Sequence, residues 1–373
     1  MKKLSDYDYI FPTPGSFAAF TLQERLPKIL QDIINSNDLA PTASEQLKAL
    51  KNNVWEHRIQ ELPVRKLALP YWSAFFRQYV GKPLSQTPFF FGEVYFYQLI
   101  CHIIGNESLD HFEKTKQRDV ISNENFIVQT SIRYQNGQFS LSDLLLLATR
   151  GNQADLSQLS TSRQSEGPSL LMDHRLQLID RIASCDRVHF VLDNAGIELF
   201  TDLLLVHHLI KNKGVAKVFL HFKQQPIFVS DALIKDFWWL IEFLEGVDCS
   251  DFGGDIRQWI EEDTIRLASH PFWTAPAFFT QLPEDVIAND AGSLIISKGD
   301  ANYRRFFEDR DFPYSANFPE LFRDCRYQLF TLRTLKSELQ TSLDPAIVAG
   351  ITDQDWMVNG KHAVIQHLID NGQ

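Results

Sequence analysis

Two oxygen-bearing side chains, Asp193 and Asn194, follow directly after the short apolar run Val188–Leu192. Such a run of β-branched and aromatic residues is typical of a strand buried on both faces, and residues 196–211 have the length and composition of a helix. Ligands of open α/β sheets collect beyond the carboxyl ends of the strands, near the N-termini of the following helices. Asp193 and Asn194 are therefore candidates for binding a metal ion or a phosphate group.

A second apolar run, Ile227–Val229, leads into Ser230 and Asp231. We predict a strand over 227–229 and a helix over 232–244, which places Asp231 at a second strand end. Two Asp carboxylates and one Asn amide form a hard, oxygen-rich ligand set that suits Mg²⁺, Mn²⁺ or a similar divalent ion. The two strand ends together therefore predict a metal site.

A purely structural role is the alternative for these polar residues. Asn194 would then cap the following helix while Asp193 and Glu198 complement its dipole. In the same way Asp300 would cap a helix over 301–306. Capping explains each residue separately, whereas a metal site explains why oxygen ligands follow two strands.

Several segments together resemble the damage-control phosphatases, formerly a domain family of unknown function, and most closely the subfamily also labelled acidic-residue methyltransferase-like. Three of them are the Asp-Asn-Ala-Gly-x-Glu segment at 193–198, the Phe-Val-Ser-Asp segment at 228–231, and Ser297–Arg304. The further matches are Phe91–Tyr97, Gly151–Ser157, Leu332–Glu338 and Gly360–Ile365. The matches occur in the family order and cover nearly the whole chain. One departure is Gln98, where the aromatic segment of the family usually continues into Arg.

The resemblance implies a metal-dependent phosphatase that acts on a small sugar phosphate, such as a fructose phosphate. It implies a divalent ion, Mg, Mn, Co or Ni, held by Asp193, Asn194 and Asp231, with Glu198 supporting these ligands from behind. The residues that it places at the substrate are Glu93, Ser230, Lys298, Arg333, Lys336 and Lys361.

The predicted reaction is hydrolysis of a phosphate monoester by a metal-activated water, with Asp193 and Asp300 as catalytic residues. Asp300 follows Gly299 at the end of an apolar strand, where a general acid or base role is expected. A covalent aspartyl phosphate on Asp193 is the rival mechanism.

Two other functions stay open: an S-adenosylmethionine-dependent protein carboxyl methyltransferase, and a non-catalytic sugar-phosphate-binding module. The methyltransferase is disfavoured because a methyl-donor site usually needs a glycine-rich turn after its first strand, and the turn at 194–196 contains one glycine. Binding without turnover would identify the module.

Composition narrows the class of protein further. The chain has 373 residues and a formal net charge of −11, which argues against a nucleic-acid-binding surface because such surfaces are normally basic. Its four cysteines form no Cys-x-x-Cys pair, so neither a zinc site nor a disulfide framework is expected. No segment reads as a signal peptide or reaches membrane-spanning length, so we predict a cytoplasmic protein without a membrane partner. The oligomeric state stays open.

The pattern of helices and strands predicts a three-layer α-β-α sandwich with a mainly parallel sheet and an additional N-terminal helical region. We place the helical region at 1–156, a linker or loop at 157–169, and the α/β metal-binding catalytic domain at 170–373. Helices are predicted at 21–35, 43–60, 71–79, 91–104, 141–148 and 170–183. The strands, besides 188–192 and 227–229, are predicted at 216–222, 264–268, 293–296 and 327–332.

Overall fold

One twisted sheet organises the molecule. The structure is a computed structural model that describes residues 2–105, 109–151, 169–247 and 249–369. Within these residues seven strands pair in the order β1-β7-β6-β5-β2-β3-β4. Their bounds are β1 (Ser169–Asp173), β2 (Arg187–Val191), β3 (Lys217–Phe222), β4 (Ile265–Ser269), β5 (Ser293–Lys298), β6 (Gln328–Thr334) and β7 (His362–His367).

Strands β2 to β6 run parallel to one another, whereas β7 pairs antiparallel with β6, and β1 is parallel to β7. The carboxyl ends of β2, β3, β5 and β6 therefore meet at one edge of the sheet. The predicted α/β sandwich with a mainly parallel sheet is confirmed.

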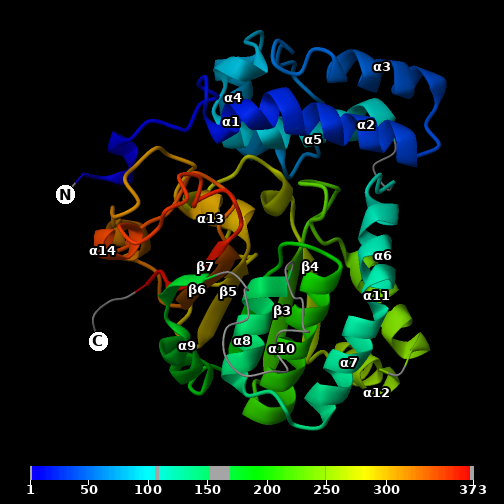
Figure 1. Ribbon diagram of the computed structural model, residues 1–373, viewed down its shortest axis with the longest axis vertical. Coiled ribbons are helices and arrows are strands. Elements are labelled where there is room, and N and C mark those ends of the chain that lie inside the picture. The colour runs from blue at the N-terminus through cyan, green and yellow to red at the C-terminus, as the bar shows by residue number, and fades with distance from the viewer. Residues whose placement is uncertain (1, 106–108, 152–168, 248, 370–373) are drawn as a thin grey trace.

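Helices cover both faces of this sheet (Figure 1). Side chains alternate along β2, so that Val188 and Phe190 pack on one face while Val191 packs on the other. The helices on the first face are α6 (Glu113–Ser122), α7 (Glu124–Gln135), α8 (Leu141–Arg150), α9 (Arg175–Ile182), α10 (Ile197–Lys213), α11 (Ile234–Gly246) and α12 (Ser250–Glu261).

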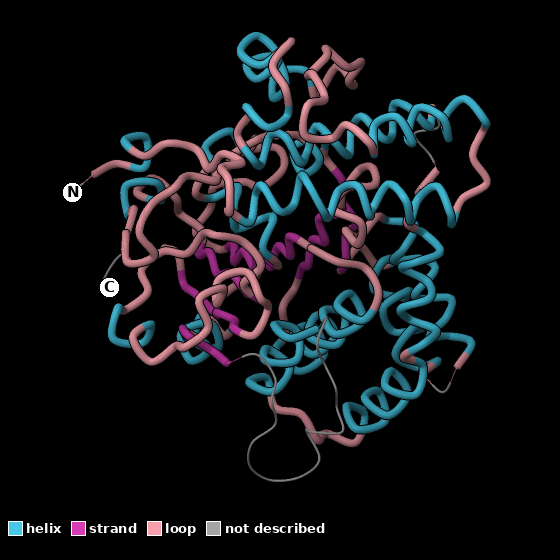
Figure 2. The backbone as a smooth tube through the Cα atoms, turned by 45° about the horizontal axis from the view of Figure 1, so that its top comes forward, coloured by secondary structure: helices cyan, strands magenta, loops and turns pink. Residues whose placement is uncertain are grey.

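The N-terminal helices form the layer on the other face, together with α13 (Asp300–Phe306) and the aromatic loop 271–279. Figure 2 shows the strands, in magenta, lying between helices on both sides. The N-terminal helices are α1 (Phe17–Phe20), which continues through a π-helical turn at Thr21–Arg25, α2 (Leu26–Ser36), α3 (Pro41–Lys51), α4 (Leu69–Tyr79) and α5 (Phe89–Ile104). The short helix α14 (Pro345–Val348) lies near the C-terminus.

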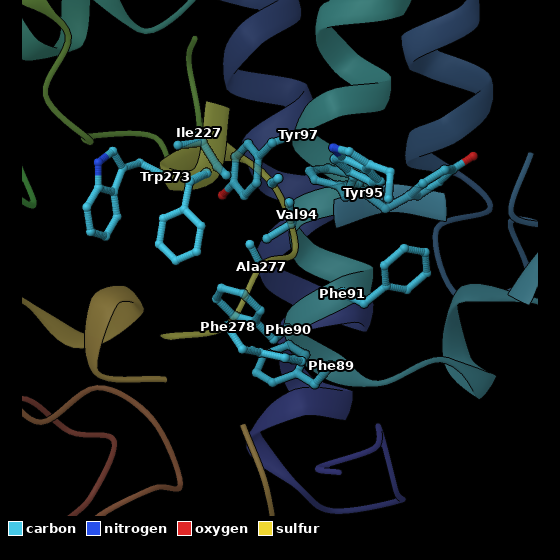
Figure 3. Packing of buried hydrophobic residues seen from close by; sticks show 14 of the residues in the cluster. Phe89, Phe90, Phe91, Val94, Tyr95, Tyr97, Ile227, Trp273, Ala277 and Phe278 are labelled. Atoms are coloured by element: carbon cyan, nitrogen blue, oxygen red, sulfur yellow. The ribbon is translucent and has the colours of Figure 1, made fainter. Parts of the chain in front are cut away.

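Helix α5 is the centre of the N-terminal layer. It is apolar on nearly every side, as expected of a helix surrounded by protein. Phe91 stacks on Phe75 of α4 with ring centroids 4.8 Å apart, and Phe90 packs near Phe278 of the aromatic loop (Figure 3). These contacts bury aromatic area on both sides of α5 and fix it against the α/β layers.

The strand predicted at 227–229 is wrong, because this segment is a turn. Pro226 lacks a backbone N–H to donate to a ladder, and Phe228 and Val229 have φ values of 50° and 67°, which lie outside the strand region. Asp231 therefore follows a loop after β3 rather than the end of a strand of its own.

Two other predicted elements are corrected. The helix predicted over 170–183 is strand β1 followed by α9, because the apolar residues at its start pair with β7. The helix predicted over 43–60 ends at Lys51, and beyond it Ile59 donates its N–H to the carbonyl of Lys82, which makes that stretch extended. Short apolar runs fit both a strand and a helix, which explains the first error.

The predicted linker at 157–169 lies outside the described residues except for its last residue, which belongs to β1. The division into a helical region and a catalytic domain stays a prediction. Helix α8, within the predicted helical region, contacts α10 and β6. Among the described helices, none is both long and apolar enough to span a membrane.

Two buried histidines on adjacent strands make stability depend on pH. His189 and His221 hydrogen-bond to each other, with Nδ1 and Nε2 3.0 Å apart, and burial lowers the pKa of His189 to about 4 and of His221 to about 3. Both are neutral when folded, whereas in the unfolded chain they protonate near pH 6.5. At these two positions the unfolded state thus binds more protons between about pH 4 and 6.5, and the stability that the two histidines contribute falls as pH decreases through this window.

We expect the contribution of these two histidines to the free energy of unfolding, measured by urea titration, to decline from pH 7 to pH 5. The contribution is isolated by comparing the parent with a His189 variant, because buried acids such as Asp202, whose pKa is about 7, act in the opposite direction over this range. In the His189→Phe variant the decline should be smaller by about 1–2 kcal/mol, since one histidine contributes at most about 1.4 kcal/mol per pH unit. An equal decline in both proteins would contradict the prediction.

Candidate active site

Two loops bring the three predicted metal ligands together. Backbone hydrogen bonds join them: Ala195 donates to the carbonyl of Ser230 (2.7 Å), and Ala232 donates to the carbonyl of Asp193 (2.8 Å). Asn194 and Asp231 form an antiparallel bridge at the centre of this pairing. The loops after β2 and β3 are neighbours because β2 and β3 are neighbouring strands.

A glycine after β5 leaves room for the Asp193 carboxylate. Gly299 has a φ of +76°, and a Cβ built on it would lie 1.9 Å from Asp193 Oδ2. Every larger residue is excluded there both by backbone conformation and by this close approach. Asp300 follows at once as the first residue of α13.

A small cavity opens at this edge of the sheet, with a volume of about 30 Å³. The space admits an ion or a water molecule. It is lined by Thr149, Asp193, Asn194, Glu198, Gly299, Asp300, Leu332, Arg333, Thr334 and Lys336. The loops after β2 and β5, strand β6 with the residues after it, and helices α8, α10 and α13 thus contribute to one site. Asp231 is not among the lining residues.

The Asn194 side chain is held from three sides. Its amide nitrogen donates to Asp193 Oδ2 (3.0 Å) and to Glu198 Oε2 (2.8 Å), while its amide oxygen accepts a short hydrogen bond from the Ser230 hydroxyl. Glu198 and Ser230 therefore each hold the Asn194 side chain in place through a hydrogen bond.

Lys298 binds the second carboxylate oxygen of Glu198. Its ammonium is almost fully buried and donates to Glu198 Oε1 (3.1 Å), Asp202 Oδ1 (2.7 Å) and the carbonyl of Ala148 (2.7 Å). Burial opposes its charge, yet the two carboxylates raise the pKa of Lys298 overall. Burial raises the pKa of Asp202 to about 7, with Lys298 acting in the opposite direction.

Negative charge is in excess where the predicted ligands meet. Burial raises the pKa of Asp193 well above its usual range, and the Asp231 and Glu198 carboxylates raise it further. Burial likewise raises the pKa of Asp231, although Lys223 lies 3.2 Å from Asp231 Oδ2 and lowers it. This oxygen has no hydrogen-bond partner in the described part of the chain.

These residues fit a divalent cation. Carboxylate and amide oxygens are hard ligands, and the buried Asp193 carboxylate, with Asp231 and Glu198 as acidic neighbours, is electrostatically suited to a metal ion. Asp231 Oδ2 is buried too, with the Lys223 ammonium as its ion-pair partner. Counting only His, Cys, Asp and Glu, the described residues contain no group of three that could hold a metal ion, and the candidate set includes the Asn194 amide.

Two predicted substrate residues line the cavity on the side of β6. Arg333 is buried, lies 3.1 Å from Asp300 and stacks on the Tyr303 ring at 3.8 Å. Its Nη2 donates to the carbonyl of Leu339, but Nε and Nη1 have no hydrogen-bond partner among the described residues. Lys336 lies beside it, and its backbone N–H donates to Asp300 Oδ1 (3.2 Å).

Two other predicted substrate residues lie outside the cavity lining. Glu93 is buried in α5 and forms an ion pair with Arg304, which also binds Asp309 through two nitrogens. Lys361 precedes β7 at the same sheet edge, but its side chain is 67 % exposed and pairs with Asp353. Their substrate roles stay predictions.

Several residues of the site escaped the sequence analysis. Lys223 follows β3 directly, and its ammonium contacts Asp231 and the carbonyl of Leu192 (2.8 Å). Thr149 arrives from α8, a helix whose sequence carries no sign of a site. Gln98, by contrast, is the departure from the family pattern noted in the sequence, and it accepts a hydrogen bond from Gln225 in the loop that leads to Asp231.

The fold and the site define an α/β protein with an oxygen-rich candidate cation site at the carboxyl edge of a mainly parallel sheet. Residues 21–348 match the family model described as the damage-control phosphatase ARMT1-like domain. The chain belongs to this family, which confirms the resemblance found in its motifs, and the family consists of metal-dependent phosphatases.

Named relatives match this chain over different lengths. Human damage-control phosphatase ARMT1 is 27 % identical, in an alignment that covers 95 % of this chain and 96 % of the human protein. The zebrafish (Danio rerio) protein of the same name is 37 % identical over 48 % of this chain and 42 % of its own length. The crystal structure of a DUF89 family protein from Pyrococcus horikoshii superposes with a TM-score of 0.52 at 14 % identity, covering 93 % and 98 % of the two chains, and shows a shared fold.

The Gly299→Ala substitution tests the close approach at Asp193. We expect it to destabilise the protein by about 1–3 kcal/mol and to abolish metal binding, because the new methyl group displaces the carboxylate. Gly254→Ala is the matched control, since no atom lies within 4 Å of a Cβ at this position of α12, and it should leave stability unchanged or raise it by about 1 kcal/mol. Urea unfolding and Mn²⁺ titration measure both effects; similar behaviour of the two variants would refute the steric account.

Proposed function

We propose that this protein hydrolyses small sugar phosphates, such as a fructose phosphate, with the help of a divalent metal ion. The observation that carries the proposal is one cavity that holds both kinds of group such a reaction needs. Its lining includes the carboxylate and amide groups of Asp193, Asn194 and Glu198. It also includes Lys336 and Arg333, whose buried Nε and Nη1 have no hydrogen-bond partner among the described residues. A phosphate oxygen that reaches into this cavity would meet a candidate cation site and two positive side chains.

The divalent ion, Mg²⁺, Mn²⁺, Co²⁺ or Ni²⁺, would be held by Asp193, Asn194 and Asp231. When bound, such an ion would supply Lewis-acid stabilisation of the phosphoryl oxygens and would activate water for attack. Asn194 is kept in place by Glu198 and Ser230. These supporting bonds leave the predicted ligands pre-oriented before substrate arrives.

Arg333 and Lys336 would bind the phosphate. The unpartnered nitrogens of Arg333 suit two phosphate oxygens, and its stacking on Tyr303 restrains the guanidinium plane. Asp300, which contacts both Arg333 and the backbone of Lys336, would receive a proton from the attacking water or return one to the leaving sugar oxygen.

Direct attack by water is favoured over a phosphorylated Asp193. Asp193 Oδ2 accepts a hydrogen bond from Asn194 and lies against Gly299, so this carboxylate has little freedom to move toward a phosphorus atom. Lys298 and Ser230 act in this proposal through Glu198 and Asn194 rather than by touching substrate.

The decisive assay is phosphate release by chelator-treated protein from a panel of sugar phosphates, with Mg²⁺, Mn²⁺, Co²⁺ or Ni²⁺ restored. We expect metal-dependent release, reduced by roughly 100-fold or more in Asp231→Asn, which keeps the shape of the side chain but removes its charge. Asp255→Asn is the control, because this acid pairs with Lys211 and His207 on α10, outside the cavity lining.

If none of these metals restores phosphate release, the proposed phosphatase activity is overturned. Calorimetry with S-adenosylmethionine would then test the carboxyl methyltransferase, and calorimetry with sugar phosphates would test a binding module without turnover. If Asp231→Asn is as active as the parent protein, the metal-ligand role of Asp231 is refuted, and the phosphatase activity itself is not.

A second expectation concerns the metal-free protein. Because burial and two neighbouring acids raise the pKa of Asp193, its ionised form is destabilising at neutral pH when no cation is bound. Asp193→Asn should therefore raise the Tm measured in chelator and lose the further rise that the parent protein gains with Mn²⁺. A lower Tm in chelator would contradict the excess of negative charge.

A further inference from the structure

Helix α6 contacts both loops that carry the proposed metal ligands. It runs alongside α11 in Figure 1, between the N-terminal helices and α7. Two of its residues, Lys116 and Asp119, lie three positions apart and therefore share one face of the helix. One contacts the loop of Asp231, and the other contacts the loop of Asp193 and Asn194.

The Lys116 side chain binds the backbone of the loop that carries Asp231. Its buried ammonium donates to the carbonyl of Asp231 (2.7 Å), and it also donates to Asp110 Oδ2 (2.9 Å) and to Asp236 Oδ2 (2.8 Å). Asp236 also accepts the N–H of Leu233 (2.8 Å), at the start of α11. A single cation thus joins α6, α11 and the residue that offers a carboxylate to the site.

Asp119 binds the second loop at the start of α10. Its Oδ2 accepts the N–H of Ile197 (3.0 Å), the first residue of that helix. The residue before it, Gly196, has no side chain to cap the helix, and a Cβ there would lie 2.1 Å from Asp119 Oδ2. Asp119 therefore supplies from α6 the cap that α10 lacks, and the glycine makes room for it.

We propose that Lys116 and Asp119, here called the α6 pair, are positioning residues that set the separation between the Asp193–Asn194 loop and Asp231, and thereby the affinity for the divalent ion. The inference rests on the proposed metal site. The two loops already bond to each other through Ala195 and Ser230, so their pairing fixes the register while the α6 pair holds both to one rigid helix. Neither residue lines the cavity.

The test measures metal binding directly, without turnover. Mn²⁺ binding to the chelator-stripped full chain is followed by the paramagnetic resonance of free Mn²⁺. We expect Asp119→Ala to bind Mn²⁺ about 10- to 100-fold more weakly. Asp119→Asn should recover most of the affinity, because its amide oxygen can still accept the Ile197 N–H. The exposed position of Asp119 makes its variants suitable if a Lys116 variant does not fold.

Lys116 is tested by Lys116→Met, with circular dichroism to confirm that the variant is folded, and we expect the same weakening. Glu113→Gln is the matched control on the same helix, since Glu113 pairs with Lys235 of α11 and contacts neither ligand loop. At saturating metal, the KM for sugar phosphate should be unchanged in the Asp119 variants, while the metal concentration for half-maximal activity rises.

The outcomes separate the two proposals. If the parent chain binds no Mn²⁺, the metal site of the proposed function fails. If the parent binds Mn²⁺ and both Asp119→Ala and Glu113→Gln bind it equally well, the α6 pair is only structural and the inference is overturned.

Discussion

The crowding of carboxylates at the end of β2 is the constraint on which the rest of the site depends. Asp193, Glu198, Asp202 and Asp231 are all buried close to one another, and burial makes each charge costly unless a cation is near. Lys298 balances the lower part of this group by binding two of the acids. The upper part, around the cavity, keeps more negative charge than its lysine neighbours offset, which is the electrostatic condition for a divalent cation.

The architecture supplies these groups from elements far apart in the chain. The parallel strands β2, β3, β5 and β6 end at one edge, so residues from four loops converge there. The N-terminal helical region contributes as well. The carbonyl of Ala148 accepts a hydrogen bond from Lys298, and α6 contacts both ligand loops. The predicted boundary between a helical region and a catalytic domain therefore crosses contacts that the site uses.

Membership in the damage-control phosphatase ARMT1-like family accounts for the chemistry of the site and leaves its specificity to local differences. One candidate for such a difference is Gln98, at a position where the motif resemblance predicts an Arg; it contacts Gln225 beside the loop of Asp231. Two neutral amides meet at this place, and neither carries the charge that an Arg would bring.

The sequence by itself determined the features that depend on short-range patterns. The apolar run before Asp193, the helix that follows it and the central helix α5 are visible because hydrophobic period and turn residues act over about ten positions. The family motifs added the set of acids, although a turn rather than a strand carries Asp231.

Only the tertiary structure decided which charges pair. Lys298, expected at the phosphate, lies beneath the site with Glu198, about a hundred positions away along the chain, and its partners follow from packing rather than from any local spacing. The polar helix α6 gave no apolar signal, yet packing places Lys116 and Asp119 at the two ligand loops. Ion pairs form between groups that folding brings together, and a one-dimensional pattern contains no record of those distances.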